Sequence, residues 1–382
     1  MRAVRHVALQ DVAQIERDVL DASAIEDGTM YVGLENIESG GRFVGVRPIA
    51  AGELLSSKFT FTPRHLLYGK LRPYLAKIAR PDFEGICSTD ILPVLPGPEL
   101  DRGYLAWLLL SPQMLAQASS RATGANLPRL SPRALAELRI PLPPLPEQRR
   151  IAEILDKADA LRAKRRAALA QLDTLTQSIF LDMFGDPIAN SRSWPTKKLA
   201  ALGSLDRGVS KHRPRNAPGL LGGPYPFVQT GDVANCGGYI RDYSATYSEA
   251  GLRQSKMWPA GTLCITIAAN IAKTGILTFD ACFPDSVVGF RADELATVLF
   301  VRGWLSFLQA SLEDKAPESA QKNINLEILR GLDVPTPDLL LRMEFARRID
   351  AVESLKGSEM DSQAELDVLF ASLQHHAFRR EL

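Results

Sequence analysis

The 382-residue sequence lacks the features that mark membrane, secreted and metal-binding proteins. No apolar run approaches the length of a membrane span, and the first 18 residues carry charges where a secretory signal needs its apolar region. The four cysteines are scattered and form no CxxC pair, so we interpret them as buried, reduced thiols and expect no metal site. These absences together predict a cytoplasmic protein.

Motifs for catalysis are missing as well. The sequence has no GxxxxGK for ATP phosphates, no GxGxxG, no HExxH and no Asn/Asp-Pro-Pro-aromatic methyltransferase motif. Residues 319–322 fit the pattern SxxK, but no companion motif supports it, so we interpret the match as accidental. We therefore expect no catalytic residues and no cofactor held by this chain.

The charge balance gives little sign of a polyanionic ligand. The 45 basic and 44 acidic residues leave a net charge of +1. Proteins that bind DNA neutralise phosphates with lysine and arginine. If this chain binds DNA, we expect a partner to supply part of the cationic surface.

The most informative stretch of the sequence is residues 140–184, where a proline-rich segment leads into a long helix. Four prolines in six positions (141, 143, 144 and 146) predict an extended entry, and Pro146 suits the first helical turn. From Glu147 to Phe184 apolar residues recur every three or four positions, which predicts one helix with a seam for a partner helix. The predicted seam residues are Ile151, Ile154, Leu161, Leu172, Leu175 and Ile179.

This stretch returns 194 residues later, as residues 334–378. Twelve of the 45 paired positions are identical, whereas chance gives about three at ordinary residue frequencies. An internal repeat of this length indicates duplicated architecture. We expect the two helices to pair antiparallel and to hold two domains at opposite ends, related by a pseudo-twofold axis. The second half of the seam is predicted at Phe345, Ile349, Val352, Leu355, Leu366, Leu369 and Leu373.

The remaining sequence predicts two mixed α/β domains with the same order of short strands and helices. In the first, periodicity predicts one amphipathic helix from Gly103 to about Ser119, and Ser131 is the predicted N-cap of the next short helix. The predicted fold class is α+β, with two α/β domains joined by two long helices in an antiparallel coiled coil. The predicted boundaries are 1–140 for the first domain, 141–189 for the first helical spacer, 190–336 for the second domain and 337–382 for the second spacer. Differences between the copies fall in loops, as two binding modules of different specificity require.

The arrangement resembles the specificity subunit of type I restriction-modification systems. The resemblance is carried by IPLPPLPEQRRIAEIL at residues 140–155, by FLDMFGDP at residues 180–187 and by the domain–helix–domain–helix duplication. It implies that each domain is a target recognition domain reading one half of a split sequence in double-stranded DNA, with the helices setting the spacer. It also implies a non-catalytic chain that docks methyltransferase (M) subunits, typically two, and restriction (R) subunits, which hold S-adenosylmethionine, ATP and Mg. At the second junction Leu340 and Leu341 replace the Pro-Glu pair, so an identical contact at both junctions is not implied.

Candidate DNA contacts are basic, amide and aromatic residues on loops at matching places in the two domains. Lysine and arginine neutralise phosphates, arginine also reads guanine, and asparagine reads adenine. In the first domain the candidates are Lys58, Lys70, Arg72, Tyr74, Lys77, Asn126 and Arg129. In the second they are Lys256, Asn270, Lys273, Gln321, Lys322 and Asn323. The competing interpretation of each is an exposed turn with solvated charges.

Two other functions fit the sequence. One is a protein-binding scaffold whose modules hold other proteins across a helical spacer, and a shallow dependence of affinity on salt would distinguish it from a DNA-binding protein. The other is a specificity subunit of a related modification system with a fused methyltransferase-nuclease partner, which the neighbouring genes would reveal.

Overall fold

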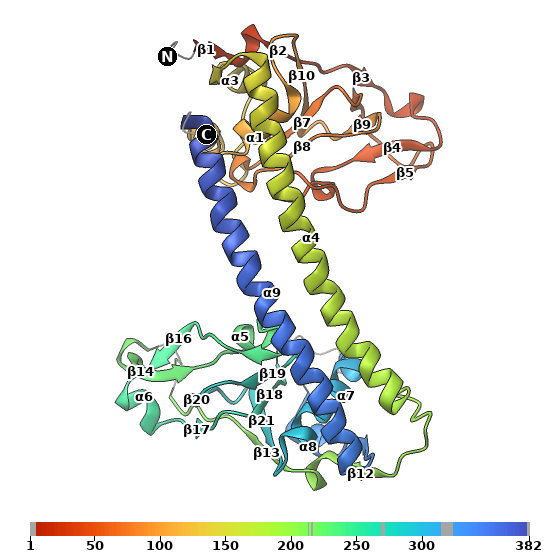
Figure 1. The fold of residues 1–382 in the computed structure, drawn as a ribbon, viewed down its shortest axis with the longest axis vertical. Helices are drawn as coiled ribbons and strands as arrows, with labels where there is room; N and C mark the ends of the chain where they lie inside the picture. Colours follow the sequence, from red (N-terminus) through yellow and green to blue (C-terminus); the bar gives the residue numbers. More distant parts are fainter. Residues whose placement is uncertain (1–4, 213, 215–216, 269–271, 315–323, 380–382) are drawn as a thin grey trace. The chain divides into compact units, whose positions relative to one another are not determined.

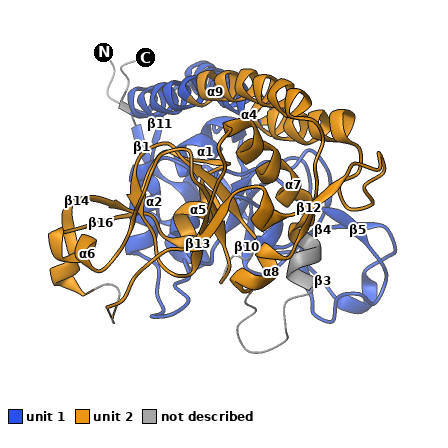
Figure 2. Ribbon diagram, turned by 90° about the horizontal axis from the view of Figure 1, so that it is seen from below, with its two compact units in different colours: residues 1–166, 361–382 blue, residues 167–360 orange. Residues whose placement is uncertain are grey.

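The computed structural model describes residues 5–212, 214, 217–268, 272–314 and 324–379. The chain divides into two compact units, coloured separately in Figure 2: unit 1 comprises Met1–Arg166 and Asp361–Leu382, and unit 2 comprises Ala167–Met360. The two long helices, α4 (Leu145–Phe184) and α9 (Leu339–Arg379), each contribute one part to either unit. Among the described helices, none combines the length and apolar character needed to cross a bilayer.

The described residues of unit 1 form three sheets and three short α-helices. Figure 1 shows their fold. The sheet orders are β1-β11, β2-β10-β7-β8 and β3-β6-β9-β4-β5. The strands are β1 (Arg5–Ala8), β2 (Ala13–Ile15), β3 (Val19–Leu20), β4 (Thr29–Val32), β5 (Arg47–Ile49), β6 (Lys58–Phe61), β7 (Leu66–Gly69), β8 (Ile78–Ala79), β9 (Gly85–Cys87), β10 (Ile91–Pro96) and β11 (Arg139–Leu142). The helices are α1 (Arg102–Leu109), α2 (Pro112–Ser120) and α3 (Pro132–Ala136), with 3₁₀ turns η1 (Leu9–Asp11), η2 (Ala22–Ala24), η3 (Leu34–Asn36) and η4 (Pro73–Leu75).

Unit 2 repeats this plan with small differences. Its sheet orders are β12-β22, β13-β21-β18-β19-β15 and β16-β14-β20-β17. The strands are β12 (Thr196–Lys198), β13 (Ser204–Arg207), β14 (Leu221–Phe227), β15 (Tyr239–Ile240), β16 (Ala245–Tyr247), β17 (Met257–Trp258), β18 (Leu263–Thr266), β19 (Thr274–Leu277), β20 (Ala281–Cys282), β21 (Val287–Arg291) and β22 (Asp333–Pro335). The helices are α5 (Thr230–Asn235), α6 (Glu249–Arg253), α7 (Leu295–Asp314) and α8 (Leu326–Arg330), with 3₁₀ turns η5 (Leu199–Ala201) and η6 (Pro218–Leu220).

The repeat extends to strand pairing. β4 pairs in parallel with β9 in unit 1, where Val32 lies opposite Cys87, and β14 pairs in parallel with β20 in unit 2, where Phe227 lies opposite Cys282. A parallel pair inside mostly antiparallel sheets needs a crossover connection, so its presence in both units shows the same chain path. The predicted internal repeat of two mixed α/β regions is confirmed.

One predicted helix of unit 1 proves to be two. Periodicity predicted a single helix from Gly103 to about Ser119, but α1 ends at Leu109 and α2 begins at Pro112. The break has a local cause, because proline stops a helix and Ser111 caps the next one by accepting a hydrogen bond from Met114 N. The predicted cap of α3 is confirmed, since Ser131 Oγ accepts from Ala134 N at 3.1 Å.

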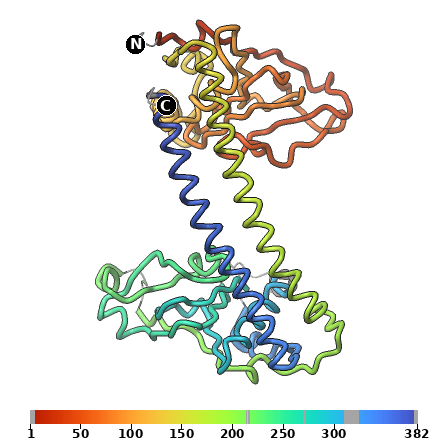
Figure 3. Tube along the Cα trace, in the orientation of Figure 1, coloured from red at the N-terminus to blue at the C-terminus, as the bar shows by residue number. Residues whose placement is uncertain are grey.

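Each unit completes its core with residues from both long helices. The core of unit 1 includes Ile151 and Leu155 of α4 together with Phe370 and Ala377 of α9. The core of unit 2 likewise takes side chains from both helices: Phe180, Met183, Phe184, Phe345 and Ile349. The trace in Figure 3 shows the last part of α9, in blue, returning to unit 1, which therefore contains both ends of the chain.

The long helices contact each other within each unit. In unit 1, Arg162 Nε donates to Asp367 Oδ1 at 2.6 Å, and its guanidinium lies 4.3 Å from the ring centre of Phe370. In unit 2, Lys356 Nζ lies 2.7 Å from Asp173 Oδ1. The order of contacts in unit 2 is antiparallel, because Asp182 approaches Arg348 while the earlier Asp173 meets the later Lys356. The predicted pairing of the helices is confirmed.

The predicted seam is only partly correct. Ile151, Phe345, Ile349 and Val352 are buried, and Ile154, Leu172, Ile179, Leu366 and Leu373 are half-buried. The prediction is wrong for four leucines, which are between 43% and 53% exposed: Leu161, Leu175, Leu355 and Leu369. A straight α-helix drifts by about 20° per heptad relative to a seven-residue repeat, so one register does not face the partner over the whole length.

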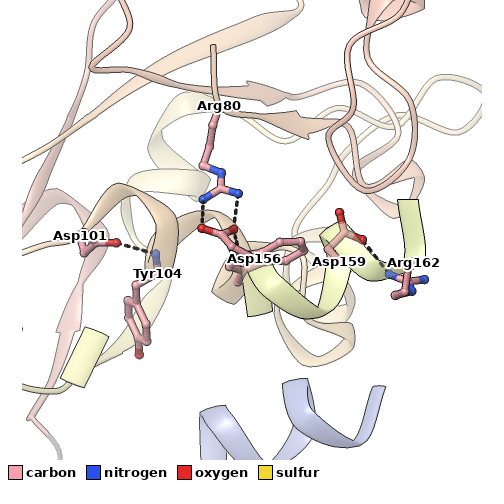
Figure 4. Close-up of polar contacts among 7 residues, drawn as sticks. Arg80, Asp101, Tyr104, Asp156, Asp159 and Arg162 are labelled. Atoms are coloured by element: carbon pink, nitrogen blue, oxygen red, sulfur yellow. Dashed lines mark hydrogen bonds and ion pairs between the residues drawn. The ribbon is translucent and has the colours of Figure 1, made fainter. Parts of the chain in front are cut away.

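A carboxylate fixes the first turns of α4 to the strands and helices of unit 1 (Figure 4). Asp156 Oδ1 and Oδ2 accept hydrogen bonds from both terminal nitrogens of Arg80, at 2.5 and 3.2 Å. Asp156 Oδ1 also accepts from Trp107 Nε1 at 2.8 Å. Two planar donors thus meet one carboxylate, which sets the rotation of α4 against β8 and α1.

Candidate nucleic-acid interface

Three loops of unit 1 are bound together into one surface, here called the three-loop face: residues 70–77, 88–90 and 122–130. Lys70 N donates to Asp90 O at 2.9 Å, and Leu130 N donates to Lys70 O at 2.9 Å. Arg72 N donates to Pro128 O at 2.7 Å. Since these bonds join three loops distant in sequence, the side chains at their tips have fixed relative positions.

The described residues of unit 2 repeat two of these three bonds. Ile267 N donates to Ser286 O at 3.0 Å, and Ile324 N donates to Ile267 O at 3.0 Å. A further bond is shared, because Gly69 N donates to Lys77 O in unit 1 and Thr266 N donates to Lys273 O in unit 2. The backbone is therefore alike at this place in both units, while the side chains differ.

The three-loop face brings together most of the predicted contacts of the first domain. Lys70 Nζ and Arg129 Nε both approach Asp90 Oδ1, at 3.6 and 3.4 Å. Arg72 is exposed, and one of its terminal nitrogens donates to Asn126 O at 3.5 Å. Three cations and the amide of Asn126 therefore lie on one surface. Arginine and asparagine there suit base edges or phosphates, and Asp90 holds two of the cations in place.

Asp90 was not among the predicted contacts, although it lies at the centre of this cluster. The only signal for it was a polar turn, residues 88–90, between two apolar strands. A carboxylate at this position lowers the net positive charge of the face. It also gives the face an acceptor, which can receive a hydrogen bond from cytosine or adenine.

The turn that carries Tyr74 has a strained backbone. Arg72 (φ 51°) and Ala76 (φ 52°), on either side of η4, are both in the left-handed region although neither is glycine. Such a conformation costs about 1–2 kcal/mol per residue and persists only where the surroundings enforce it. Pro73 and Ala76 are buried beneath the turn, and Tyr74 at its tip is 55% exposed.

Two predicted contacts in unit 1 point into the protein. Lys58 is 6% exposed, and its ammonium donates to Ser56 O and Ser56 Oγ, both at 2.6 Å. Burial lowers the pKa of Lys58. A DNA contact by Lys58 stays a prediction, while in this structure its ammonium is already hydrogen-bonded inside the unit. Lys77 is half-buried and donates to Leu34 O at 2.6 Å, so it braces the loop.

The candidates of unit 2 are less concentrated. Lys256 is exposed, with its ammonium 4.0 Å from the ring centre of Trp258 and 3.9 Å from Asp206 Oδ2. Lys273 lies directly before β19 and follows Ala272, whose φ of 57° repeats the left-handed alanine of unit 1. The other predicted contacts lie outside the described residues: Asn270, Gln321, Lys322 and Asn323.

Comparisons with known proteins agree on one family. The sequence profile described as "Type I restriction modification DNA specificity domain" matches residues 6–171 and again residues 193–365. The chain is 32% identical over 161 residues to the type I restriction enzyme EcoDI specificity subunit of Escherichia coli, covering 41% of this chain and 36% of the relative. It is 22% identical over 310 residues to the EcoKI specificity subunit of Escherichia coli strain K12, covering 73% and 65%. The matches thus span less than two thirds of either relative.

Solved structures share the fold. The type I restriction-modification S subunit from M. genitalium superposes with a TM-score of 0.60 at 14% identity, covering 98% of this chain and 96% of that one. A chain from a structural study of complex assembly and conformational transition of the type I R-M system gives a TM-score of 0.58 at 22% identity, covering 99% and 98%. The arrangement of two mixed units and two long helices is therefore one already observed in solved structures.

Proposed function

Because the chain belongs to the type I restriction-modification DNA specificity family, we propose that it is the DNA sequence-specificity subunit of such a complex. It binds a bipartite site in double-stranded DNA, with one half read by each unit. The observation that carries the proposal is the shared loop frame: three backbone bonds of the three-loop face recur at matching positions of unit 2, where the sequence has different side chains. Two domains that recognise different DNA sequences need such a shared framework with loops that differ in their side chains.

In this proposal residues 1–140 and 190–336 are the target recognition domains, and residues 141–189 and 337–382 are the spacers. The paired helices fix the distance and rotation between the readers. On B-DNA two half-sites about one helical turn apart, roughly 34–36 Å, present the same face, so the spacing is itself part of the recognised signal.

The chemistry belongs to partner chains. The subunit is non-catalytic and docks two methyltransferase subunits, and restriction subunits join them. S-adenosylmethionine, ATP and Mg are bound by those partners, and the complex works in the cytoplasm. In unit 1 the contacts to DNA come from Lys70, Arg72, Tyr74, Asn126 and Arg129, with Lys77 behind them.

The test is methylation by the reconstituted complex. The chain is produced together with the methyltransferase encoded beside it, and methylated positions are mapped in a host with and without this chain. We expect one split motif whose methylation requires the chain. Exchanging residues 70–77 for the matching loop of unit 2 should change one half of the motif and leave the other.

Methylation without sequence preference in the complete complex would contradict the proposal. Salt dependence gives a second check. Contacts to phosphates make affinity fall steeply and linearly on a log–log plot against salt concentration, whereas a protein-binding scaffold would show a shallow dependence.

A further inference from the structure

The three-loop face of unit 1 carries apolar side chains among its cations. Tyr74 is 55% exposed, Leu75 is 38% exposed and Leu127 is 46% exposed. Single exposed apolar residues are common on protein surfaces. These three lie on adjoining loops, because Arg72 N bonds Pro128 O and the Arg72 guanidinium bonds Asn126 O, on either side of Leu127.

The fold holds these side chains rigidly. Both ends of η4 are in the left-handed conformation, and both are tied to other loops: Arg72 N donates to Pro128 O, and Gly40 N donates to Ala76 O at 3.1 Å. The strain at Arg72 and Ala76 is thus maintained by neighbouring backbone, and the result is a fixed tip bearing Tyr74 and Leu75. Backbone strain of this kind clusters at sites that hold a ligand.

Duplex DNA offers few apolar groups at its surface. The phosphates and sugar edges attract the lysines and arginines, and the base edges in the major groove carry polar donors and acceptors. The exception is the C5-methyl group of thymine, which apolar side chains contact directly. Polar side chains lie beside these apolar ones and can hydrogen-bond the base edges next to such a methyl group: Arg72, Asn126 and Arg129.

We propose that Tyr74, Leu75 and Leu127 form an apolar contact with thymine C5-methyl groups in the half-site read by unit 1. The inference rests on the proposed DNA-recognition function and adds a chemical requirement to it: this half-site contains at least one T·A pair at the position facing η4.

The second unit supplies an internal control. Its matching loop is one residue shorter, with five residues between Ile267 and Lys273 against six between Lys70 and Lys77. Its sequence there is Ala-Ala-Asn-Ile-Ala, without an arginine, a proline or an aromatic residue. Binding should therefore depend on thymine methyl groups through Tyr74 in only one half of the bipartite site.

The experiment removes methyl groups one at a time. Once the motif of the complete complex has been mapped, each thymine in both halves is replaced by deoxyuridine, and binding is measured for the wild type and for Tyr74→Ser. We expect one or more replacements in one half to weaken wild-type binding about three- to fivefold, the value of burying one methyl group. With Tyr74→Ser the same replacements should have little effect, and Tyr74→Phe should behave like the wild type.

Several results would overturn the inference. One is a motif whose affected half contains no T·A pair. Another is a Tyr74→Ser complex that binds weakly while every deoxyuridine replacement is neutral in the wild type. If 2-aminopurine beside the site then brightens on binding, Tyr74 acts as a wedge that unstacks bases. Thermal unfolding of Tyr74→Ser should match the wild type, since the side chain is exposed.

The outcome also separates this inference from the proposed function. A complex that discriminates its motif but ignores deoxyuridine refutes the methyl contact alone. A complex with no sequence preference refutes the DNA-recognition function itself.

Discussion

Trp107 donates a hydrogen bond from Nε1 to Oδ1 of Asp156 at 2.8 Å, and this bond attaches α1 to the first turns of α4. The matching tryptophan of unit 2, Trp304, is buried, but its Nε1 has no hydrogen-bond partner in the part of the chain that the structure describes. The two units thus share the tryptophan but hold it differently. In unit 1 a hydrogen bond joins the tryptophan to α4, whereas in unit 2 the ring of Phe180 on α4 packs edge-on against Phe345 of α9.

Replacing Asp156 by alanine should lower the free energy of unfolding by about 1–3 kcal/mol, because Trp107 Nε1 is left buried without an acceptor. The lost ion pair with Arg80 should contribute less to this change, since the Arg80 side chain is 30% exposed and water solvates its guanidinium. The matched control is Asp350→Ala, 194 residues later, where the side chain is exposed and the change should be within about 0.5 kcal/mol. Denaturant unfolding of both variants measures the difference, and equal effects would contradict the role given to Asp156.

Phe370→Ala should destabilise unit 1 strongly. Phe370 is 8% exposed, lies edge-on to Trp107 at 5.4 Å between ring centres, and has the Arg162 guanidinium over its face. Removing a buried phenyl ring costs about 3–5 kcal/mol. Val368→Ala, on the same helix but 72% exposed, is the control and should change stability little. If calorimetry gives similar melting temperatures for the two variants, α9 does not complete the core of unit 1.

Arg72→Ala should weaken specific DNA binding by the reconstituted complex by about 1–3 kcal/mol if the guanidinium reads a base, with altered preference at one position. If it contacts a phosphate, binding should weaken for all sequences and the slope of log K against log salt should fall by about one. Arg133→Ala is the control, because its side chain is 88% exposed on α3 and pairs with Glu137. Titration at several salt concentrations distinguishes the cases, and identical curves for the two variants would exclude Arg72 from the interface.

The four thiols should differ in reactivity. Burial raises the pKa of Cys87 to about 12 and raises the pKa of Cys264 and Cys282. Cys236 is partly exposed, and burial raises its pKa as well. In the native protein an alkylating reagent should therefore modify Cys236 first. The rate should rise about tenfold per pH unit between pH 7 and 8, because only the thiolate reacts.

Mass spectrometry of the alkylated chain identifies the modified residue. Cys236→Ser should abolish the fast phase, and unfolding in guanidinium should make all four thiols react. Rapid modification of Cys87 in the folded protein would contradict its burial beside β4.

The parts of the fold that follow from local chemistry could be predicted from sequence. The Gly-Asp-Pro segment ends α4 at Phe184 as predicted, whereas the helix begins at Leu145, two residues before the predicted Glu147. The serine cap of α3 acts as expected. The repeat also identified the loops that bear Lys70 and Arg129, because matched loops on a duplicated framework occupy equivalent places.

Side-chain direction could not be predicted in the same way. Lys58 follows two serines in a segment that reads as an exposed turn, yet its ammonium folds back onto Ser56. Leu161 and Leu369 fit the apolar period, yet both are exposed, because the phase of a long helix drifts against its partner. Asp90 was not predicted because a carboxylate repels phosphate, so only basic, amide and aromatic residues were considered as DNA contacts. In the structure it forms ion pairs with both Lys70 and Arg129.

The return of α9 to unit 1 also bears on the order in which the protein folds during synthesis. Unit 2 ends at Met360, so all of its residues have been made while the segment that supplies Phe370 and Ala377 is still missing from unit 1. At about 5–20 residues per second the ribosome needs roughly 10–40 s to reach that segment after finishing Arg166. Unit 1 is therefore synthesised first but completed last. Until the end of α9 has been made, Trp107 lacks its ring contact with Phe370.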